Sequence, residues 1–230
     1  MERKKLSLVE LDAIPYKDEK GIQIPSERIE REEQKDAELY IPAQAIVLEL
    51  GGRYGLAAAV INNRLDDPTK HIVVEPDPSV QDALKLNCDS HKCFYSIFQG
   101  VISRQAMYFN SFGFSSFCSS VPNDTPVETL TLEEVQEKYG VSGFTHLVAD
   151  CEGGLMDFFE ENKEFIAGLQ GIYFEGDMKR RMTINYTPLR KFLQEHGFQQ
   201  KKLGFRQYWE RVKLDSHLEE YCHINAANLS

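Results

Sequence analysis

The chain has few of the features that mark nucleic-acid-binding proteins. Among its 230 residues, 26 are Lys or Arg and 36 are Asp or Glu, so the formal net charge is -10. Proteins that bind nucleic acid through phosphate neutralisation need basic surfaces. The one dense basic run, Lys179-Arg180-Arg181, is short and lies beside Glu175 and Asp177. The composition therefore argues against a nucleic-acid partner.

The sequence also lacks long apolar segments and paired cysteines. Its first eight residues are charged and hold no apolar core of signal-peptide length, and no later stretch approaches a membrane span. The five cysteines form no Cys-x-x-Cys pair, which fits reduced thiols. Cys88, His91 and Cys93 lie close in sequence, but structural zinc needs four ligands. We expect a cytoplasmic protein without a membrane partner and without a metal.

The length and the 42% hydrophobic content suffice for one core of ordinary size. We expect a charged helical arm over residues 1–40, one folded domain over residues 41–215, and a tail over residues 216–230.

The arm contains a segment, Ser26 to Lys35, that is charged throughout. It suits a solvated helix with Ser26 as its N-cap and an ion pair between Arg28 and Glu32, because it has no apolar stripe. Two alternatives are open for the arm: closure over a ligand, or contact with a second copy of the chain in a homodimer.

What the chain does contain is a compact strand, turn, helix and strand unit between Ala45 and Asp77. An apolar run ends at two glycines, and a third glycine, Gly55, opens an alanine-rich helix. A second apolar run, His71 to Val74, then ends on Glu75. Open α/β sheets bind ligands at the carboxyl ends of such parallel strands. The unit predicts a site for an adenosine-containing cofactor.

The glycine spacing favours one cofactor over another. The turn, Glu49-Leu50-Gly51-Gly52-Arg53-Tyr54-Gly55, reads E-x-G-x-x-x-G, whereas a dinucleotide fingerprint reads G-x-G-x-x-G. The Glu49 carboxylate would repel a pyrophosphate but suits the ammonium of a methionine-like group. Glu75 can accept hydrogen bonds from two vicinal ribose hydroxyls. The pattern favours S-adenosylmethionine over NAD.

The residues expected to bind the cofactor follow the first four strands of the sheet. They are Glu49, Gly51, Gly52, Arg53, Tyr54, Gly55, Glu75, Pro76, Gly100, Val101 and Asp150. The plainer interpretation is that any strand-to-helix turn needs glycine and that Glu49 and Glu75 only end strands. The presence of both motifs at the right separation makes that interpretation the weaker one.

Later segments resemble the FkbM-type methyltransferases in type and in order. They are VEPDP at 74–78 with Leu86-Asn87 downstream, VETLTLEEV at 127–135, LVADCEGGLMDFF at 147–159, IYFEGD at 172–177 and FLQEHGF at 192–198. Asp150, Glu152 and Gly153 resemble the D-x-E-G segment of that family. The resemblance spans about Ala45 to Phe198. It implies an S-adenosylmethionine-dependent methyltransferase that acts on a hydroxyl of a sugar, a glycan or another small molecule.

The departures from this family concern charge. The family usually has Asp, Ala-Asn and Lys where this chain has Glu49, Gly52-Arg53 and Ala149. Glu49 keeps the negative charge, whereas Arg53 and Ala149 change the charge near the site. The acceptor of better-known members therefore does not carry over to this chain.

The expected fold is a Rossmann-like class I methyltransferase fold. It comprises a mostly parallel seven-stranded sheet, helices on both faces and an antiparallel C-terminal strand pair. After the opening unit, we expect strands at 94–103, 145–150, 171–175, 198–203 and 205–212, and helices at 78–87, 130–139, 155–162 and 187–196. The aromatic and serine-rich stretch from Met107 to Ser120 suits either a ligand-binding loop or a segment that fills the core.

The chemistry is expected from carboxylates at strand ends. Methyl transfer needs the acceptor in line with the methyl carbon, and a hydroxyl acceptor also benefits from a base. We expect Asp150 to face the sulfonium and Glu152 to hold or deprotonate the hydroxyl; alternatively, Glu152 caps the next helix. Glu175 and Asp177 are expected to line the acceptor pocket. A magnesium ion on Asp150, Glu152 and Asp177 would be chemically suitable but has no further support.

Other residues and other classes are less favoured. His71 and His146 lie at the entering ends of strands, away from the expected site. A non-catalytic S-adenosylmethionine- or nucleotide-binding module would tolerate the loss of Asp150 and Glu152. A NAD-dependent oxidoreductase is disfavoured by the glycine spacing.

Overall fold

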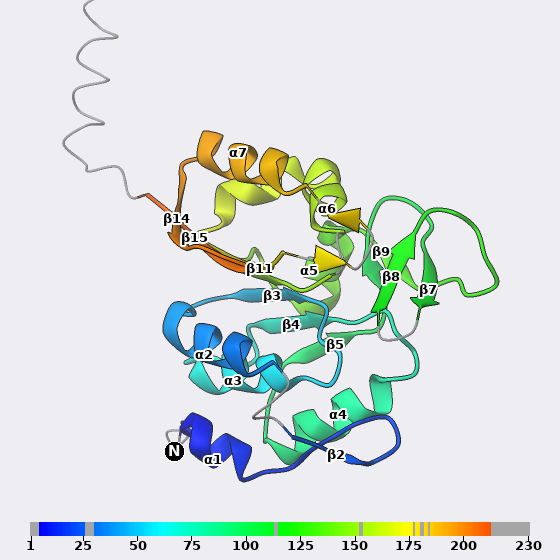
Figure 1. Ribbon diagram of the computed structural model, residues 1–230, viewed down its shortest axis with the longest axis vertical. Helices are drawn as coiled ribbons and strands as arrows, with labels where there is room; N and C mark the ends of the chain where they lie inside the picture. Colours follow the sequence, from blue (N-terminus) through cyan, green and yellow to red (C-terminus); the bar gives the residue numbers. More distant parts are fainter. Residues whose placement is uncertain are drawn as a thin grey trace, which may run out of the picture.

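A computed structural model describes residues 5–25, 30–112, 115–151, 154–176, 178–179, 182–183 and 185–212. Its centre is a seven-stranded sheet with the order β14-β15-β11-β10-β3-β4-β5 (Figure 1). The strands are β3 (Val47–Leu50), β4 (His71–Val74), β5 (Ser96–Phe98), β10 (His146–Ala149), β11 (Gly171–Glu175), β14 (Phe198–Lys202) and β15 (Arg206–Arg211).

Strand β15 runs antiparallel to both of its neighbours, and the other six strands are parallel to one another. From β3 the chain moves outward through β4 and β5, and it then returns to β10 on the other side of β3. The reversal of direction between β3 and β10 opens a crevice at their carboxyl ends. This order, with its closing antiparallel strand, confirms the predicted class I methyltransferase fold.

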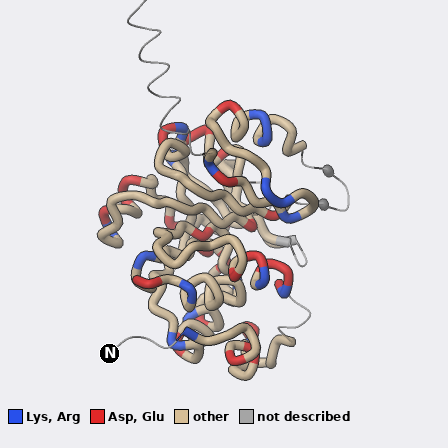
Figure 2. Tube along the Cα trace, turned by 90° about the vertical axis from the view of Figure 1, so that its left-hand side faces the viewer, with Lys and Arg blue, Asp and Glu red and all other residues tan. Residues whose placement is uncertain are grey.

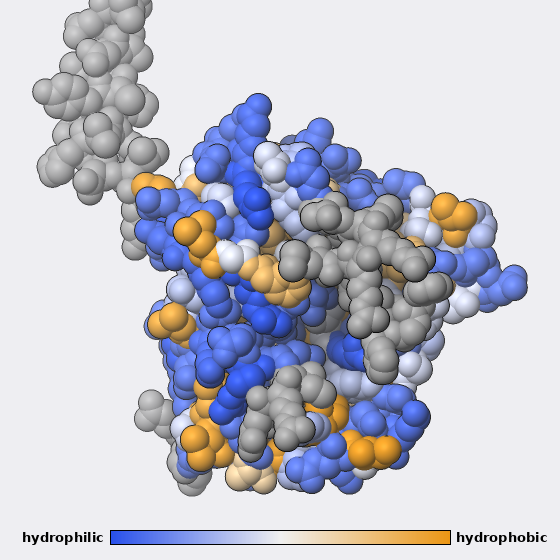
Figure 3. Space-filling model, in the orientation of Figure 1, coloured by the Kyte–Doolittle hydropathy of each residue, from blue (hydrophilic) through white to orange (hydrophobic). Residues whose placement is uncertain are grey.

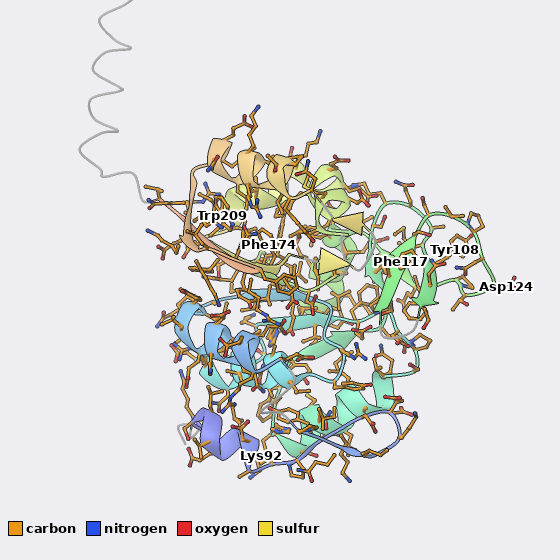
Figure 4. The ribbon with its side chains drawn as sticks, in the orientation of Figure 1. Lys92, Tyr108, Phe117, Asp124, Phe174 and Trp209 are labelled. Atoms are coloured by element: carbon orange, nitrogen blue, oxygen red, sulfur yellow. The ribbon has the colours of Figure 1, made fainter. Side chains whose placement is uncertain are left out.

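Helices cover both faces of the sheet. On one face lie α1 (Leu8–Asp12), α2 (Arg31–Tyr40), α3 (Leu56–Arg64) and α4 (Gln81–Ser90), and on the other lie α5 (Leu132–Tyr139), α6 (Leu155–Glu161), the 3-10 helix η1 (Lys163–Gly168) and α7 (Thr187–Glu195). Strand side chains alternate between the faces, so that Leu48 packs toward α5 to α7 and Val47 toward α1 to α3. Phe174 and Trp209, both fully buried, lie beneath α7 (Figure 4).

Helix α5 shows how local sequence sets these boundaries. Thr131 caps its amino end and Glu134 returns a hydrogen bond to Thr131, so the two form a capping box. Gly140 ends the helix with φ +64, a conformation that glycine adopts at little cost. Sequence patterns of this kind predicted α5, α6 and α7 to within two residues.

The predicted third strand, 94–103, is wrong as a single element. It divides into β5 and β6 (Val101–Ile102), because β6 leaves the main sheet and pairs with β9 (Thr129–Leu130). Gly100 lies at the division. A Cβ atom there would come within 2.3 Å of the Glu128 carbonyl oxygen, so the chain can turn toward β9 only without a side chain.

The segment after β6 is a hairpin rather than an irregular loop. β7 (Tyr108–Phe112) and β8 (Ser115–Ser119) pair antiparallel and stand beside the carboxyl edge of the sheet (Figure 1). Two further short pairs are β1 (Tyr16–Lys17) with β2 (Gln23–Ile24), and β12 (Met178–Lys179) with β13 (Met182–Thr183).

The expectation of a solvated N-terminal helix is also wrong. Ser26 and Arg28 lie outside the described residues; α2 begins at Arg31, and Glu32 pairs with Lys35. One face of α2 is buried although it is polar, because Gln34 donates to the Leu56 carbonyl oxygen at 3.3 Å and other side chains find charged partners. The predicted tail, 216–230, lies outside the described residues.

Within the described ranges, no helix combines the length and the apolarity needed to cross a lipid bilayer. On the face shown in Figure 3, apolar residues form small patches separated by hydrophilic surface.

Candidate functional site

A cavity of about 610 Å³ opens at the carboxyl edge of the sheet. Cavities of this size hold small-molecule ligands. Its walls come from α2, the strand ends, the β7–β8 hairpin and α6. Eight of the eleven predicted cofactor-binding residues line it: Glu49, Gly51, Arg53, Glu75, Pro76, Gly100, Val101 and Asp150.

The turn after β3 brings two strand ends close together. Gly51 has φ +92, and a Cβ atom at this position would lie 2.0 Å from the carbonyl oxygen of Asp150. No side chain fits in that gap, so glycine is required where the turn passes the end of β10. Arg53, the residue that departs from the family pattern, also has positive φ, at +40. Its backbone N–H donates to Oε2 of Glu75 at 2.7 Å.

Gly52, Tyr54 and Gly55 were predicted to bind the cofactor but are not among the residues that line the cavity. A Cβ atom on Gly52 would lie 2.2 Å from Val73, and one on Gly55 would lie 2.7 Å from the Tyr95 hydroxyl. Both glycines therefore allow the turn to pack on β4 and its surroundings. The Tyr54 hydroxyl donates to Glu19 at 2.5 Å, in the turn between β1 and β2.

Glu75 is 5% exposed and organises the end of β4. Its Oε2 accepts from Arg53, and its Oε1 accepts from the Asp77 amide at 2.8 Å. Burial raises the pKa of the Glu75 carboxyl, while these two amide hydrogen bonds act in the opposite direction. A carboxylate has about four lone-pair sites, so both oxygens retain acceptor capacity toward the cavity.

Glu49 is almost fully buried and contacts a residue that the sequence interpretation had set aside. Its Oε2 lies 2.7 Å from Nε2 of His71, which is completely buried. Glu49 is aligned with Val73 on β4, and His71 lies two residues before Val73 on the same face of that strand. The pairing was therefore readable only once the register of the two strands was known.

Helix α2 forms an acidic wall that the sequence interpretation also missed. Glu33 and Asp36 are each 6% exposed, and both line the cavity. Glu33 pairs with Arg206 at 3.2 Å, while Asp36 accepts from Lys202 and from the Tyr173 hydroxyl. These contacts attach α2 to β14 and β15. Acidic residues appear along the middle of the chain trace as well as on its outside (Figure 2).

Three carboxylates meet where α2 approaches the sheet. Glu33, Asp150 and Glu175 each offer an oxygen atom, and these atoms lie within 4.8 Å of one another. Arg206 also pairs with Glu175 at 2.9 Å. Burial, the hydrogen bond with Glu175 and the nearby carboxylates raise the pKa of Glu33. Arg206 and a retained proton therefore reduce the negative charge of this cluster.

Of the predicted catalytic and acceptor-binding residues, the structure describes Asp150 and Glu175. Asp150 lines the cavity at the end of β10, as expected. Glu175 is not among the lining residues, although its carboxylate lies in the cluster with Asp150 and Glu33. Glu152 and Asp177 lie outside the described residues.

The other end of the cavity is made by the hairpin and by α6. The hairpin contributes Ser111, Ser116, Phe117, Cys118, Ser119 and Ser120, and α6 contributes Asp157, Phe158, Glu160 and Glu161. Burial, together with the carboxylates of Glu75 and Asp77, raises the pKa of the Cys118 thiol to about 12. Cys118, Glu75 and Asp77 line the same cavity. Figure 4 shows Tyr108 and Phe117 on this hairpin, to one side of the sheet.

Glu161 connects α6 to the segment that follows β6. Its carboxylate accepts from the Ser103 hydroxyl at 3.1 Å and from the Arg104 amide at 2.7 Å. Asp157 and Glu160, by contrast, are exposed, and neither side chain forms a hydrogen bond or ion pair within the described part of the chain.

The strand order and the crevice decide the architecture of the site. The chain has the class I methyltransferase fold. No family model and no curated protein sequence matches it. The FkbM resemblance therefore stays a prediction.

Several solved structures have a similar fold. An O-methyltransferase from Bacillus cereus in complex with S-adenosylhomocysteine is 12% identical, with a TM-score of 0.49 over 79% of this chain and 81% of that one. Aeropyrum pernix fibrillarin with bound S-adenosylmethionine is 14% identical, with a TM-score of 0.47 over 81% and 76%. Precorrin-6y C5,15-methyltransferase from Geobacter metallireducens is 9% identical, with a TM-score of 0.47 over 79% and 85%. At such identities the likeness concerns the fold alone.

Proposed function

We propose that the protein is an S-adenosylmethionine-dependent methyltransferase, and that its acceptor is a hydroxyl group of a sugar, a glycan or another hydroxylated small molecule. One observation carries the cofactor half of this proposal. Glu49, Gly51, Glu75, Gly100 and Asp150 come from different strand ends and line one cavity at the switch point of the sheet.

The residues fit the cofactor by their chemistry. Glu75 has acceptor capacity left for two vicinal ribose hydroxyls after it binds two backbone amides. Pro76 and Val101 offer apolar contact next to it, where an adenine ring would lie. Glu49 and Asp150 supply negative charge for an ammonium and a sulfonium group. The cavity suits a cationic nucleoside better than a pyrophosphate, which the same carboxylates would repel.

When bound, the cofactor supplies an electrophilic methyl group. The work of this chain is then to position the acceptor and to take its proton. Asp150 lines the cavity at the end of β10, and we assign it to the sulfonium and the acceptor. Glu152 keeps its proposed role in holding or deprotonating the acceptor hydroxyl. The serines of the hairpin and the carboxylates of α6 suit an acceptor rich in hydroxyl groups.

Calorimetry tests the cofactor half. We expect saturable binding of S-adenosylmethionine and S-adenosylhomocysteine, and no binding of NADH over the same concentrations. Absence of binding of both sulfur compounds would refute the proposal.

The acceptor half needs a labelled-cofactor screen. A panel of glycans, sugars and small hydroxylated metabolites, incubated with protein and methyl-labelled cofactor, is analysed by mass spectrometry. We expect a labelled methyl ether that is absent when Asp150→Ala replaces the unchanged protein. Label on nitrogen or on carbon would contradict the proposed oxygen acceptor.

A further inference from the structure

The proposed function gives no role to His71, which forms a buried contact with Glu49. His71 is 0% exposed, and Glu49 is 3% exposed. The His71 ring also lies edge-on to Tyr95, with the ring centroids 5.4 Å apart. Its second nitrogen, Nδ1, is buried and has no hydrogen-bond partner among the described residues.

These surroundings decide where the proton lies. A neutral imidazole with its hydrogen on Nε2 donates to Glu49 and leaves Nδ1 as a bare acceptor. A hydrogen on Nδ1 would be a buried N–H donor without an acceptor, and orphaned buried N–H groups are rarer in native proteins than under-satisfied acceptors. A doubly protonated ring would carry this hydrogen on Nδ1. A protonated Glu49 that donates to Nε2 would require it as well, because a neutral ring that accepts at Nε2 has its hydrogen on Nδ1. The contact is therefore an Nε2–H donor to an ionised carboxylate.

The hydrogen bond matters because Glu49 is a buried acid. A carboxylate in such surroundings tends to take up a proton unless a donor stabilises its charge. His71 is the one side chain in the described residues that donates to Glu49. Glu49 also has an acidic neighbour: burial and the nearby Glu49 carboxylate both raise the pKa of Glu30, which lines the same cavity.

We propose that His71 is a positioning residue for cofactor binding, which keeps Glu49 ionised and in place to bind the ammonium of the cofactor's methionine part. This inference rests on the proposed function. It assigns a role to a residue at the far end of β4, and that residue lines no part of the cavity. The role resembles that of groups that orient metal ligands, where the supporting hydrogen bond is needed for tight binding.

Two ligands separate this role from a purely structural one. S-adenosylhomocysteine has the ammonium, whereas 5′-methylthioadenosine keeps the adenosine and lacks the amino-acid part. In calorimetry with the full chain, we expect His71→Leu to weaken binding of S-adenosylhomocysteine by about 10- to 100-fold. Binding of 5′-methylthioadenosine should change by less than about twofold, since no interaction with Glu49 is lost.

Conservative variants define the required group. His71→Gln keeps an N–H donor at a similar distance, so we expect it to retain S-adenosylhomocysteine affinity within about threefold. Glu49→Gln should reproduce the selective loss seen with His71→Leu. The double variant should lose little more than either single variant, because both changes remove the same interaction.

His146 is the matched control. It is a buried histidine at the first residue of neighbouring β10, contacts Thr145 at 3.0 Å and does not line the cavity. His146→Leu should leave the ratio of the two affinities unchanged, whatever it does to stability. If His71→Leu does not fold, His71→Asn replaces it, because its shorter amide does not reach Glu49.

The outcomes are distinct. Equal weakening of both ligands by the His71 variant, or no weakening of either, overturns the positioning role. Failure of the unchanged protein to bind either ligand overturns the proposed function instead.

Discussion

At one end of the cavity the carboxylates of Glu49 and Glu75 are buried and accept hydrogen bonds from residues of neighbouring strands and turns. At the other end, the side chains of Asp157 and Glu160 are exposed on α6 and form no hydrogen bond or ion pair with the described residues. The first end comes from the sheet, where register fixes each side chain. The second comes from a hairpin and a helix that are joined to the sheet by turns.

This difference separates what the fold fixes from what it leaves free to vary. Strand ends bring the same positions together wherever the sheet forms, so they suit a ligand that all members of a fold share. Hairpins and surface helices tolerate change and usually set specificity. We expect changes at the sheet end to affect stability and cofactor affinity, and changes at the exposed carboxylates of α6 to affect neither.

Gly51→Ala should produce the largest effect. The added Cβ would lie 2.0 Å from the Asp150 carbonyl oxygen and would be strained at φ +92. We expect a loss of more than about 3 kcal/mol in the free energy of unfolding, measured by denaturant titration. Gly140→Ala is the control, since it also has positive φ but nothing within 4 Å. It should cost about 1 kcal/mol, and equal costs would show that the close approach is unimportant.

Glu33→Gln tests the buried acids by pH. The pKa of Glu33 is raised in the folded protein above its usual value of 4.5, so the folded state retains a proton that the unfolded state releases as pH rises. The stabilisation from Glu33 is thus complete below about pH 4.5 and declines as pH rises above it. Glutamine does not titrate. The stability of the variant relative to the unchanged protein should therefore increase between pH 5 and 8, by at most about 1.4 kcal/mol per pH unit.

Thermal unfolding across this pH range provides the measurement. Glu38→Gln, on the exposed side of the same helix, is the control. A relative stability of Glu33→Gln that stays flat or falls with pH would contradict the assignment of a retained proton.

Glu75→Ala should weaken the binding of S-adenosylhomocysteine. It removes the acceptor proposed for the ribose and the acceptor for the Arg53 and Asp77 amides. Hydrogen bonds to a charged group contribute about 1.5–3 kcal/mol, so we expect a 10- to 100-fold loss by calorimetry. Glu75→Gln keeps one oxygen acceptor and should lose less. Unchanged affinity in Glu75→Ala would mean that the ribose site is misassigned.

The smallest effect is expected at the exposed end. Asp157→Asn combined with Glu160→Gln should change the free energy of unfolding by less than about 0.5 kcal/mol. Affinity for S-adenosylhomocysteine should stay within about twofold, because neither side chain forms a hydrogen bond or ion pair with the residues proposed to hold it. A large loss of affinity would remove the distinction between the two ends.

Much of the fold followed from local patterns. Apolar runs of strand length, the capping box of α5 and the glycine after α7 gave the strands and helices of the main sheet close to their observed bounds. The glycine turn after β3 and the acidic end of β4 also marked the correct edge of the sheet. Such features depend on neighbours in sequence, so they can be read without a structure.

The predictions that were wrong concern segments whose structure depends on residues far away in the sequence. Helix α2 looked solvated because its buried face is polar, and its partners, Arg206 and Lys202, lie about 170 residues away by sequence. The 94–103 segment looked continuous because nothing local shows that β6 pairs with β9. Neither feature has a periodic signal.

By itself, then, the sequence determined the order of strands and helices, the turn at Gly51 to Gly55 and the carboxylates that end β3, β4 and β10. Only the tertiary structure decided that Glu49 meets His71, that α2 closes the cavity with Glu33 and Asp36, and that Gly52, Tyr54 and Gly55 do not line it. Periodicity and turn chemistry act between near neighbours, whereas a buried charge is stabilised by whichever partner the fold places beside it.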